Sequence, residues 1–129
     1  MAEQKLILIV DDELAFREIF GAKFAADGFR IETAENGQIG IEKAKALKPD
    51  LILMDVNMPV MDGPTAVLKL RDDPETKGLK VVFLTNLGNP QKEMQELNHK
   101  FSQDFGAQGY LKKTDDLDAL NERVKAFLV

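Results

Sequence analysis

The sequence predicts a single doubly wound α/β domain with a (βα)5 arrangement, in which parallel strands alternate with helices that cover both faces of the sheet. Two observations predict this fold. Short, nearly continuous aliphatic runs recur along the 129 residues, which is typical of strands buried on both faces of a parallel sheet. Segments of helical length and period separate these runs, as the crossover connections between parallel strands require.

The predicted strands are the apolar runs, taken in chain order. Leu6–Val10 and residues 51–54 and 81–84 are bounded by charged residues, proline or asparagine, which favours interior strands. Residues 29–34 alternate apolar with charged side chains, so this strand is expected nearer the edge of the sheet. Gly109–Lys112 is a short fifth candidate.

A helix is predicted after each strand. The first, over residues 13–27, has apolar side chains at three- and four-residue spacing and stops at Gly28. The second, over residues 36–48, ends before Pro49, which cannot continue a helix. The other predicted helices cover residues 62–72, 90–106 and 115–129.

The composition excludes several classes of site. Seventeen basic and 22 acidic side chains give a net charge of −5, which disfavours broad attraction to nucleic acid or anionic lipid. The absence of cysteine excludes disulfides, cysteine-ligated metals and thiol nucleophiles, and a single histidine, His99, argues against a histidine-rich metal site. No apolar run approaches the roughly 20 residues that cross a bilayer. We therefore expect a cytoplasmic protein with one domain over residues 1–129.

Charged and hydroxyl side chains stand at the carboxyl ends of four predicted strands, where open α/β sheets place their functional crevice. These residues are Asp11 and Asp12, Asp55, Thr85, and the pair Lys112 and Lys113. Neighbouring carboxylates repel one another and require a counter-charge. Ligands that are all oxygen favour a hard ion such as Mg²⁺, and lysine suits phosphate oxygens. The pattern indicates a phosphoryl site.

Each of these residues also has an ordinary structural explanation. Acidic residues after a strand, here Asp11, Asp12 and Glu13, can simply cap the next helix. A threonine in a strand and a lysine at its end are common. Asp55 is harder to explain in this way because Asn57 and the residues after it separate it from the next helix. The functional interpretation therefore depends on the convergence of these residues at one edge.

The motifs around these residues resemble those of the receiver domain of two-component response regulators, over essentially the whole chain. The matching segments are Leu6–Val10 with Asp11 and Asp12, residues 35–37 (Glu-Asn-Gly), 48–50 (Lys-Pro-Asp), 53–63 (Leu-Met-Asp-Val-Asn-Met-Pro-Val-Met-Asp-Gly), 84–85 (Leu-Thr) and 109–113 (Gly-Tyr-Leu-Lys-Lys). The resemblance implies a flavodoxin-like sheet with strand order 2-1-3-4-5. Because the chain ends shortly after the fifth predicted helix, we expect a receiver domain without an output domain. A free-standing regulator, a phosphate relay intermediate and a fragment of a longer protein all remain open.

The resemblance further implies the role of each acidic residue. Asp55 is expected to be the phosphoacceptor. Mg²⁺ is expected to be held directly by Asp12 and Asp55, through water by Asp11, and by the backbone carbonyl of Asn57.

The hydroxyl and lysine positions follow from the same resemblance. Thr85 is expected to hydrogen-bond the phosphoryl group and Lys113 to pair with it. Family members commonly have an aromatic residue three positions before this lysine, so Tyr110 selects Lys113 over Lys112. Thr85 and Tyr110 are the expected switch residues.

The implied function is signalling rather than enzymatic turnover. A histidine kinase or histidine phosphotransfer protein is expected to donate the phosphoryl group from a phosphohistidine. The modification is then expected to change a surface made by the fourth helix, fifth strand and fifth helix, on which a downstream protein or a second copy docks. Neither nucleic acid nor membrane is expected to bind directly.

The sequence departs from the family pattern at three places. Thr114 replaces the proline that commonly follows the key lysine, and the interval from Thr85 to Lys113 is longer than usual. His99, within that interval, is expected on a solvent-facing helix surface. Leu87 cannot orient a hydrolytic water by a hydrogen bond, which predicts a long-lived phosphorylated state.

Three other functions compete with this interpretation. Hydrolases of the haloacid dehalogenase type also use a strand-end aspartate and Mg²⁺, but they need a second aspartate where this chain has Asn57. A receiver-like domain that docks partners without phosphorylation is another alternative. Nucleotide binding is disfavoured because neither a P-loop nor a G-x-G-x-x-G turn follows any predicted strand.

Overall fold

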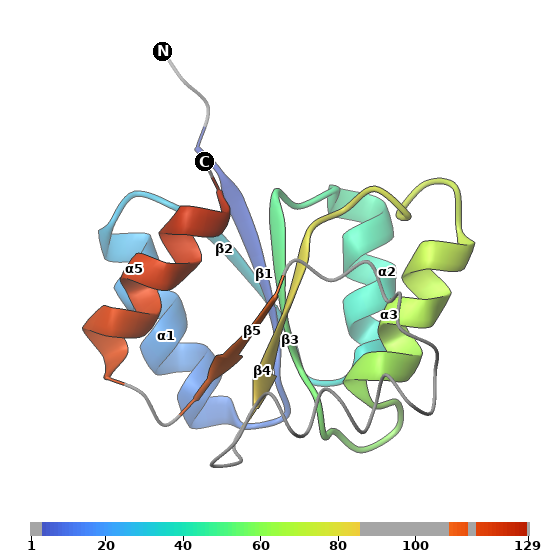
Figure 1. The fold of residues 1–129 in the computed structure, drawn as a ribbon, viewed down its shortest axis with the longest axis horizontal. Coiled ribbons are helices and arrows are strands. Elements are labelled where there is room, and N and C mark those ends of the chain that lie inside the picture. The colour runs from blue at the N-terminus through green and yellow to red at the C-terminus, as the bar shows by residue number, and fades with distance from the viewer. Residues whose placement is uncertain (1–3, 86–108, 114–115, 129) are drawn as a thin grey trace.

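The structure, a computed structural model, describes residues 4–85, 109–113 and 116–128. Its centre is a five-stranded sheet in the order β2-β1-β3-β4-β5, with every neighbouring pair parallel (Figure 1). The strands are β1 (Leu6–Val10), β2 (Arg30–Ala34), β3 (Leu51–Asp55), β4 (Val81–Thr85) and β5 (Gly109–Lys112). The predicted (βα)5 sheet and its strand order are confirmed.

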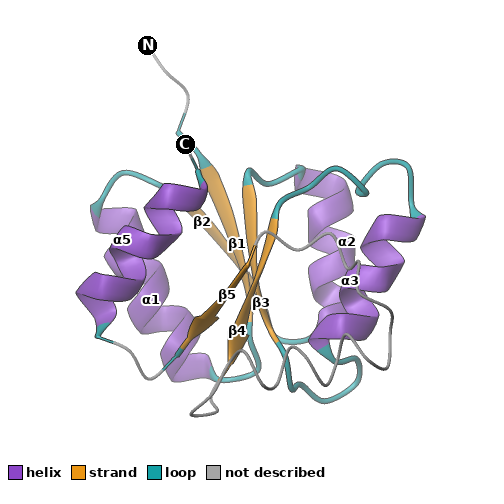
Figure 2. Cartoon of the chain, in the orientation of Figure 1, coloured by secondary structure: helices purple, strands orange, loops and turns teal. Residues whose placement is uncertain are grey.

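The described helices cover both faces of this sheet. They are α1 (Leu14–Ala26), α2 (Gly37–Leu47), α3 (Gly63–Asp72) and α5 (Leu117–Phe127). Helices α1 and α5 lie on one face, and α2 and α3 lie on the other (Figure 2). The helix predicted over residues 90–106 lies outside the described residues. Within the described part, no helix has both the length and the apolar composition needed to cross a membrane.

Three of the described helices, α2, α3 and α5, begin at a side chain that accepts a hydrogen bond from the first turn. Asn36 accepts from the Ile39 N–H, and Asp62 accepts from the Thr65 N–H at 2.8 Å. Asp116 caps α5 in the same way. Helix α2 ends at Leu47, and its C-cap Lys48 has a φ of 49° that turns the chain out of the helix just before Pro49.

Alternate strand residues supply two separate cores. Leu8, Val10, Ile52, Met54 and Phe83 face α2 and α3, whereas their neighbours along the strands face α1 and α5. Strands β1, β3 and β4 are therefore buried at every position, which explains their continuous aliphatic sequences. Strand β2 lies at the edge and is mostly partly exposed, as its alternating sequence predicts.

The strand register brings the predicted functional positions to one edge. Val10 pairs with Met54, Asp55 pairs with Leu84, and Thr85 pairs with Lys112. The next residue after Val10 is Asp11, which therefore stands level with Asp55, while Thr85 and Lys112 stand one residue further along in the row of strand ends. This row is the carboxyl edge, where ligands bind in open α/β sheets.

Candidate functional site

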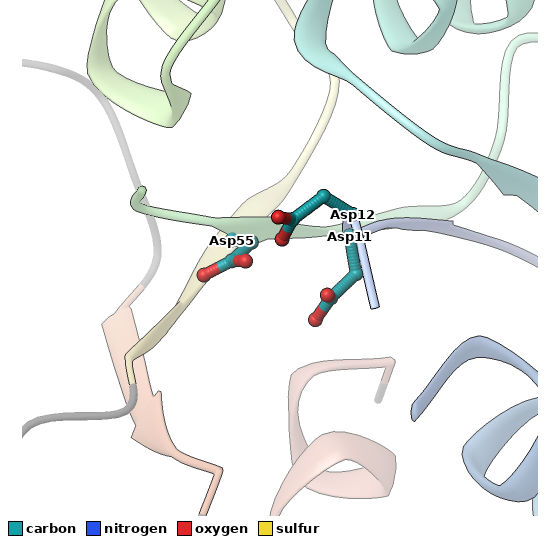
Figure 3. Close-up of side chains that lie close together, drawn as sticks. All are labelled: Asp11, Asp12 and Asp55. Atoms are coloured by element: carbon teal, nitrogen blue, oxygen red, sulfur yellow. The ribbon is translucent and has the colours of Figure 1, made fainter. Parts of the chain in front are cut away.

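Three carboxylates gather at the carboxyl edge of the sheet. Asp11 and Asp12 follow β1 and Asp55 ends β3, and the three side chains lie close together in Figure 3. One carboxylate oxygen from each residue lies within 4.8 Å of the others. Asp11 is fully buried and Asp55 is 3% exposed, whereas Asp12 is open to solvent. A cation held here would be reached from the Asp12 side.

Backbone hydrogen bonds fix the position of Asp11. Its N–H donates to the Ala34 carbonyl at 3.0 Å, which extends the pairing of β1 with β2 by one residue. Its Oδ1 accepts the Glu13 N–H at 2.8 Å, and its carbonyl accepts from the Arg17 guanidinium at 2.7 Å. The turn after β1 is therefore built around this carboxylate, with one oxygen directed to the turn and the other into the site.

The loop after β3 holds the backbone of Asp55. The Val56 N–H donates to the Leu84 carbonyl at 3.0 Å, and the Gly63 N–H donates to the Val56 carbonyl at 2.9 Å. A Cβ on Gly63 would lie 2.2 Å from the Asp55 carbonyl oxygen, so only glycine allows this approach. Between these contacts the chain turns at Val60, which has a φ of 70° and is 81% exposed.

Lys113 brings a buried ammonium to the carboxylates. Its N–H donates to the Thr85 carbonyl at 2.7 Å, which continues the β4–β5 pairing beyond the end of β5. Its Nζ lies 2.7 Å from Asp11 Oδ2, 2.6 Å from Glu13 Oε1 and 3.6 Å from Asp55 Oδ2. The side chain is 3% exposed, and Nζ lies 4.6 Å from the centre of the Phe16 ring. Of the two lysines considered, Lys113 has its ammonium in the acidic cluster.

The other predicted site residues occupy different parts of this edge. Thr85 ends β4 and is 1% exposed, and Asn57 is exposed two positions after Asp55. Tyr110 pairs with Phe83 across β4 and β5, but its side chain lies outside the described part of the chain. Leu87, His99 and Thr114 also lie outside it.

Burial and charge crowding control the ionisation of the cluster. Burial, assisted by the charge of Asp11 and contacts with Asp12, raises the pKa of Asp55 to about 7, although Lys113 opposes this shift. Burial also raises the pKa of Asp11, against the hydrogen bond from Lys113. Burial alone would lower the pKa of Lys113, but its hydrogen bonds to Asp11 and Glu13 raise it overall. The metal-free pocket therefore favours the protonated forms of Asp11 and Asp55 more than water does.

The donor set fits a hard divalent cation. The three clustered side-chain ligands are all carboxylates, and the raised pKa of Asp55 indicates that its ionisation is unfavourable in the metal-free pocket. A cation between the carboxylates would relieve their repulsion. These features suit Mg²⁺, which takes oxygen ligands and retains water on its open side.

Glu13 was expected only as a helix cap, and its pairing with Lys113 was not predicted from the sequence. Glu13 does occupy the N-cap position of α1, but its side chain makes no capping hydrogen bond. Glutamate is also absent from the residue types that cap helices well. A glutamate at an N-cap position, where it caps poorly, is the sequence feature that could have indicated a partner for its side chain outside the helix.

Comparisons with known proteins match the chain over most of its length. A family model described as the response regulator receiver domain matches residues 7–125. The DNA-binding dual master transcriptional regulator RpaA of Synechocystis is 35% identical over 122 residues, which cover 95% of this chain and 48% of RpaA. The chemotaxis protein CheY of Treponema pallidum is 34% identical over 125 residues, which cover 95% of this chain and 81% of CheY.

The fold also matches that of a solved structure. The response regulator protein TrrA from Thermotoga maritima, in complex with Mg(2+)-BeF, superposes with a TM-score of 0.80 at 30% identity. The match covers 97% of this chain and all of TrrA. By contrast, the chain spans about half the length of RpaA.

Proposed function

The chain belongs to the response regulator receiver domain family of two-component signalling, and from this premise we propose that Asp55 accepts a phosphoryl group from a phosphohistidine of a histidine kinase or histidine phosphotransfer protein. Receiver domains are signalling domains rather than catalysts of substrate turnover. The observation that supports the proposal is the convergence of three carboxylates and the buried Lys113 ammonium at one edge of the sheet.

The transfer needs an ionised Asp55. One of its carboxylate oxygens attacks the phosphorus, the bond between phosphorus and the donor imidazole nitrogen breaks, and the electron pair of that bond stays on the imidazole. The product is an acyl phosphate on Asp55. Because the pKa of Asp55 is raised to about 7, a substantial fraction of the metal-free protein is protonated at neutral pH and cannot attack.

The proposed metal ligands are the carboxylates of Asp11, Asp12 and Asp55 and the backbone carbonyl of Asn57. When bound, Mg²⁺ supplies positive charge that favours ionised carboxylates and offsets the charge of the phosphoryl oxygens. The Mg(2+)-BeF complex of TrrA, a response regulator protein with the same fold, supports Mg²⁺ as the ion.

Lys113 and Thr85 are the proposed partners of the transferred group. The Lys113 ammonium lies 3.6 Å from Asp55 Oδ2, close enough to pair with oxygens attached to that carboxylate. Thr85 ends the neighbouring strand and can donate its hydroxyl to another phosphoryl oxygen. Charge neutralisation by fixed groups of this kind is the main form of assistance that proteins give to phosphoryl transfer.

The proposed output is a change of surface around the fourth helix, β5 and α5. The phosphoryl group adds about −1.5 to −2 charges and draws Thr85 toward Asp55, which gives Tyr110 room to turn inward. This surface would then dock a downstream protein or a second copy of the chain, without direct contact to nucleic acid or membrane. The absence of a hydrogen-bonding side chain at Leu87 supports slow hydrolysis, which the decay of the modified mass would measure.

Intact-mass spectrometry tests the proposal. The protein is incubated with a small phosphodonor such as acetyl phosphate, with Mg²⁺ or with a chelator. We expect the addition of one phosphoryl group with Mg²⁺ and no addition with the chelator. Repeated hydrolysis of acetyl phosphate to free phosphate, with no adduct on the protein, would instead support a hydrolase. No modification and no hydrolysis under any condition would support a docking domain that functions without phosphorylation.

A further inference from the structure

The resting position of the Lys113 ammonium is set by residues that follow β1. Glu13 Oε1 and Asp11 Oδ2 lie 2.6 and 2.7 Å from Nζ, whereas Asp55 Oδ2 lies 3.6 Å away. The Phe16 ring, from the first turn of α1, lies 4.6 Å from Nζ. The ammonium therefore lies nearer to Glu13 and Asp11 than to the proposed phosphoacceptor.

Helix capping does not explain the glutamate at position 13. Its side chain makes no capping hydrogen bond, although the residue is the N-cap of α1. Its N–H is held by Asp11 Oδ1 at 2.8 Å, which fixes its backbone beside the pocket. The Glu13 side chain is 52% exposed, while the lysine that it contacts is 3% exposed. The carboxylate thus reaches from solvent to a buried ammonium.

Glu13 also stands apart from the proposed metal ligands. The carboxylates that gather closely enough to share a cation are those of Asp11, Asp12 and Asp55. Asp11 therefore has two proposed partners, the metal and the lysine, and the Glu13 carboxylate makes the shorter of the two contacts with that lysine. This contact indicates that Glu13 helps to set the position of the Lys113 ammonium.

We propose that Glu13 is a positioning residue that draws the Lys113 ammonium toward itself and Asp11 rather than toward Asp55 in the unphosphorylated protein and so opposes capture of the phosphoryl group. This inference rests on the proposed function. An anion attached to Asp55 competes with Glu13 for the same ammonium, and we expect the short Glu13–Lys113 contact to weaken when that anion is paired. Glu13 thereby shifts the balance toward the unphosphorylated state.

Binding of a phosphoryl mimic tests this role without the phosphotransfer step. The affinity for beryllofluoride in excess Mg²⁺ is measured by calorimetry for the wild type, Glu13→Gln and Glu18→Gln. Glu18 is an exposed glutamate on the same helix and is the matched control for the charge change. We expect Glu13→Gln to bind the mimic about fivefold more tightly, since the lost contact is half exposed, and Glu18→Gln to match the wild type. Unfolding midpoints establish that each variant is folded, with Glu13→Ala as a second variant.

A metal-free measurement reports on the lysine itself. In ¹⁵N-lysine-labelled protein, the Lys113 ammonium signal is assigned by its loss in Lys113→Arg. We expect this signal to shift in Glu13→Gln and to stay unchanged in Glu18→Gln. A merely structural role for Glu13 would change the unfolding midpoint but would leave the affinity for the mimic unchanged.

The outcomes separate this inference from the proposed function. Equal affinity in the wild type and Glu13→Gln, or equal tightening in both glutamine variants, overturns the role of Glu13 and leaves the proposed function intact. Failure of every protein, including the wild type, to bind beryllofluoride with Mg²⁺ overturns the proposed function and this inference with it.

Discussion

The backbone of Gly63 packs against the backbone of Asp55 so closely that a Cβ on Gly63 would lie 2.2 Å from the Asp55 carbonyl oxygen. The Gly63 N–H donates to the Val56 carbonyl at 2.9 Å, so the loop returns to the end of β3 just where Asp55 leaves the sheet. The start of α3 therefore packs against the backbone of the proposed phosphoacceptor and fixes its position. A side chain at position 63 has to displace backbone rather than a flexible neighbour.

This contact predicts a large cost for Gly63→Ala. We expect the free energy of unfolding in urea to fall by about 2 kcal/mol, because the added methyl group overpacks a backbone contact. Gly78→Ala is the control, since a Cβ on Gly78 would meet nothing within 4 Å. Its free energy of unfolding should change by less than about 0.5 kcal/mol. Equal effects of the two substitutions would show that the contact at Asp55 is not tight.

The turn at Val60 predicts a stabilising substitution. Val60 has a φ of 70° and is 81% exposed, so a β-branched residue occupies a left-handed conformation with little packing to compensate. We expect Val60→Asn to raise the free energy of unfolding by about 0.5–1 kcal/mol, since asparagine tolerates this conformation. Val60→Ile keeps the branching and should give no gain. A lower melting temperature for Val60→Asn would contradict the strained turn.

The ionisation of Asp55 predicts a pH-dependent stability. Its pKa is raised from 3.8 to about 7 by burial and by Asp11, so the native metal-free protein binds a proton more tightly than the unfolded chain does. The free energy of unfolding should then fall as the pH rises through this window. Asp55→Asn removes the titration. We expect the stability of Asp55→Asn relative to the wild type to increase between pH 4 and pH 7.

Denaturation of both proteins at several pH values in the presence of a chelator measures this difference. Excess Mg²⁺ should reduce it at neutral pH, because a cation stabilises the ionised carboxylate in the wild type. A difference that is constant with pH, or that decreases as the pH rises, would contradict the raised pKa.

The contacts of Lys113 predict opposite effects on metal binding and on phosphorylation. Its ammonium lies 2.7 Å from Asp11 Oδ2 and 3.6 Å from Asp55 Oδ2, where it competes with a cation for the same carboxylates. We expect Lys113→Met to bind Mg²⁺ more tightly by calorimetry. The same variant should form the phosphoryl adduct about a hundredfold more slowly, because a fixed charge at the transferred group is lost.

Lys112→Met is the matched control for this experiment. Lys112 pairs with Thr85 in the β4–β5 register, one residue before the lysine in the acidic cluster. We expect its Mg²⁺ affinity and its rate of adduct formation to match those of the wild type. A loss of phosphorylation in Lys112→Met but not in Lys113→Met would show that Lys112 assists the transfer, and it would contradict the role proposed for Lys113.

The sequence was sufficient to predict the sheet because burial controls it. Residues of β1, β3 and β4 are buried on both faces, so their aliphatic runs are continuous, while edge strand β2 keeps charged residues such as Arg30 and Glu32. The boundaries differed only slightly: the strand expected from residue 29 begins at Arg30, and the helix expected from residue 13 begins at Leu14, after its cap.

Features that depend on distant side chains could not be predicted in this way. Glu13 and Lys113 are separated by 100 positions, and their contact depends on how the turn after β1 meets the end of β5. The left-handed turn at Val60 was equally hidden, because valine is not a residue that indicates such a turn. The gathering of Asp11, Asp12 and Asp55 could be anticipated because strand ends share one edge of the sheet.

Localisation of the modification tests the central claim most directly. The protein is treated with Mg²⁺ and acetyl phosphate, reduced with borohydride, digested, and sequenced by tandem mass spectrometry, since borohydride converts an aspartyl phosphate to homoserine. The account predicts homoserine at position 55 in the wild type and none in a sample treated with chelator. Homoserine at position 11 or 12, or an unchanged Asp55 in a protein that has gained a phosphoryl group, would contradict it.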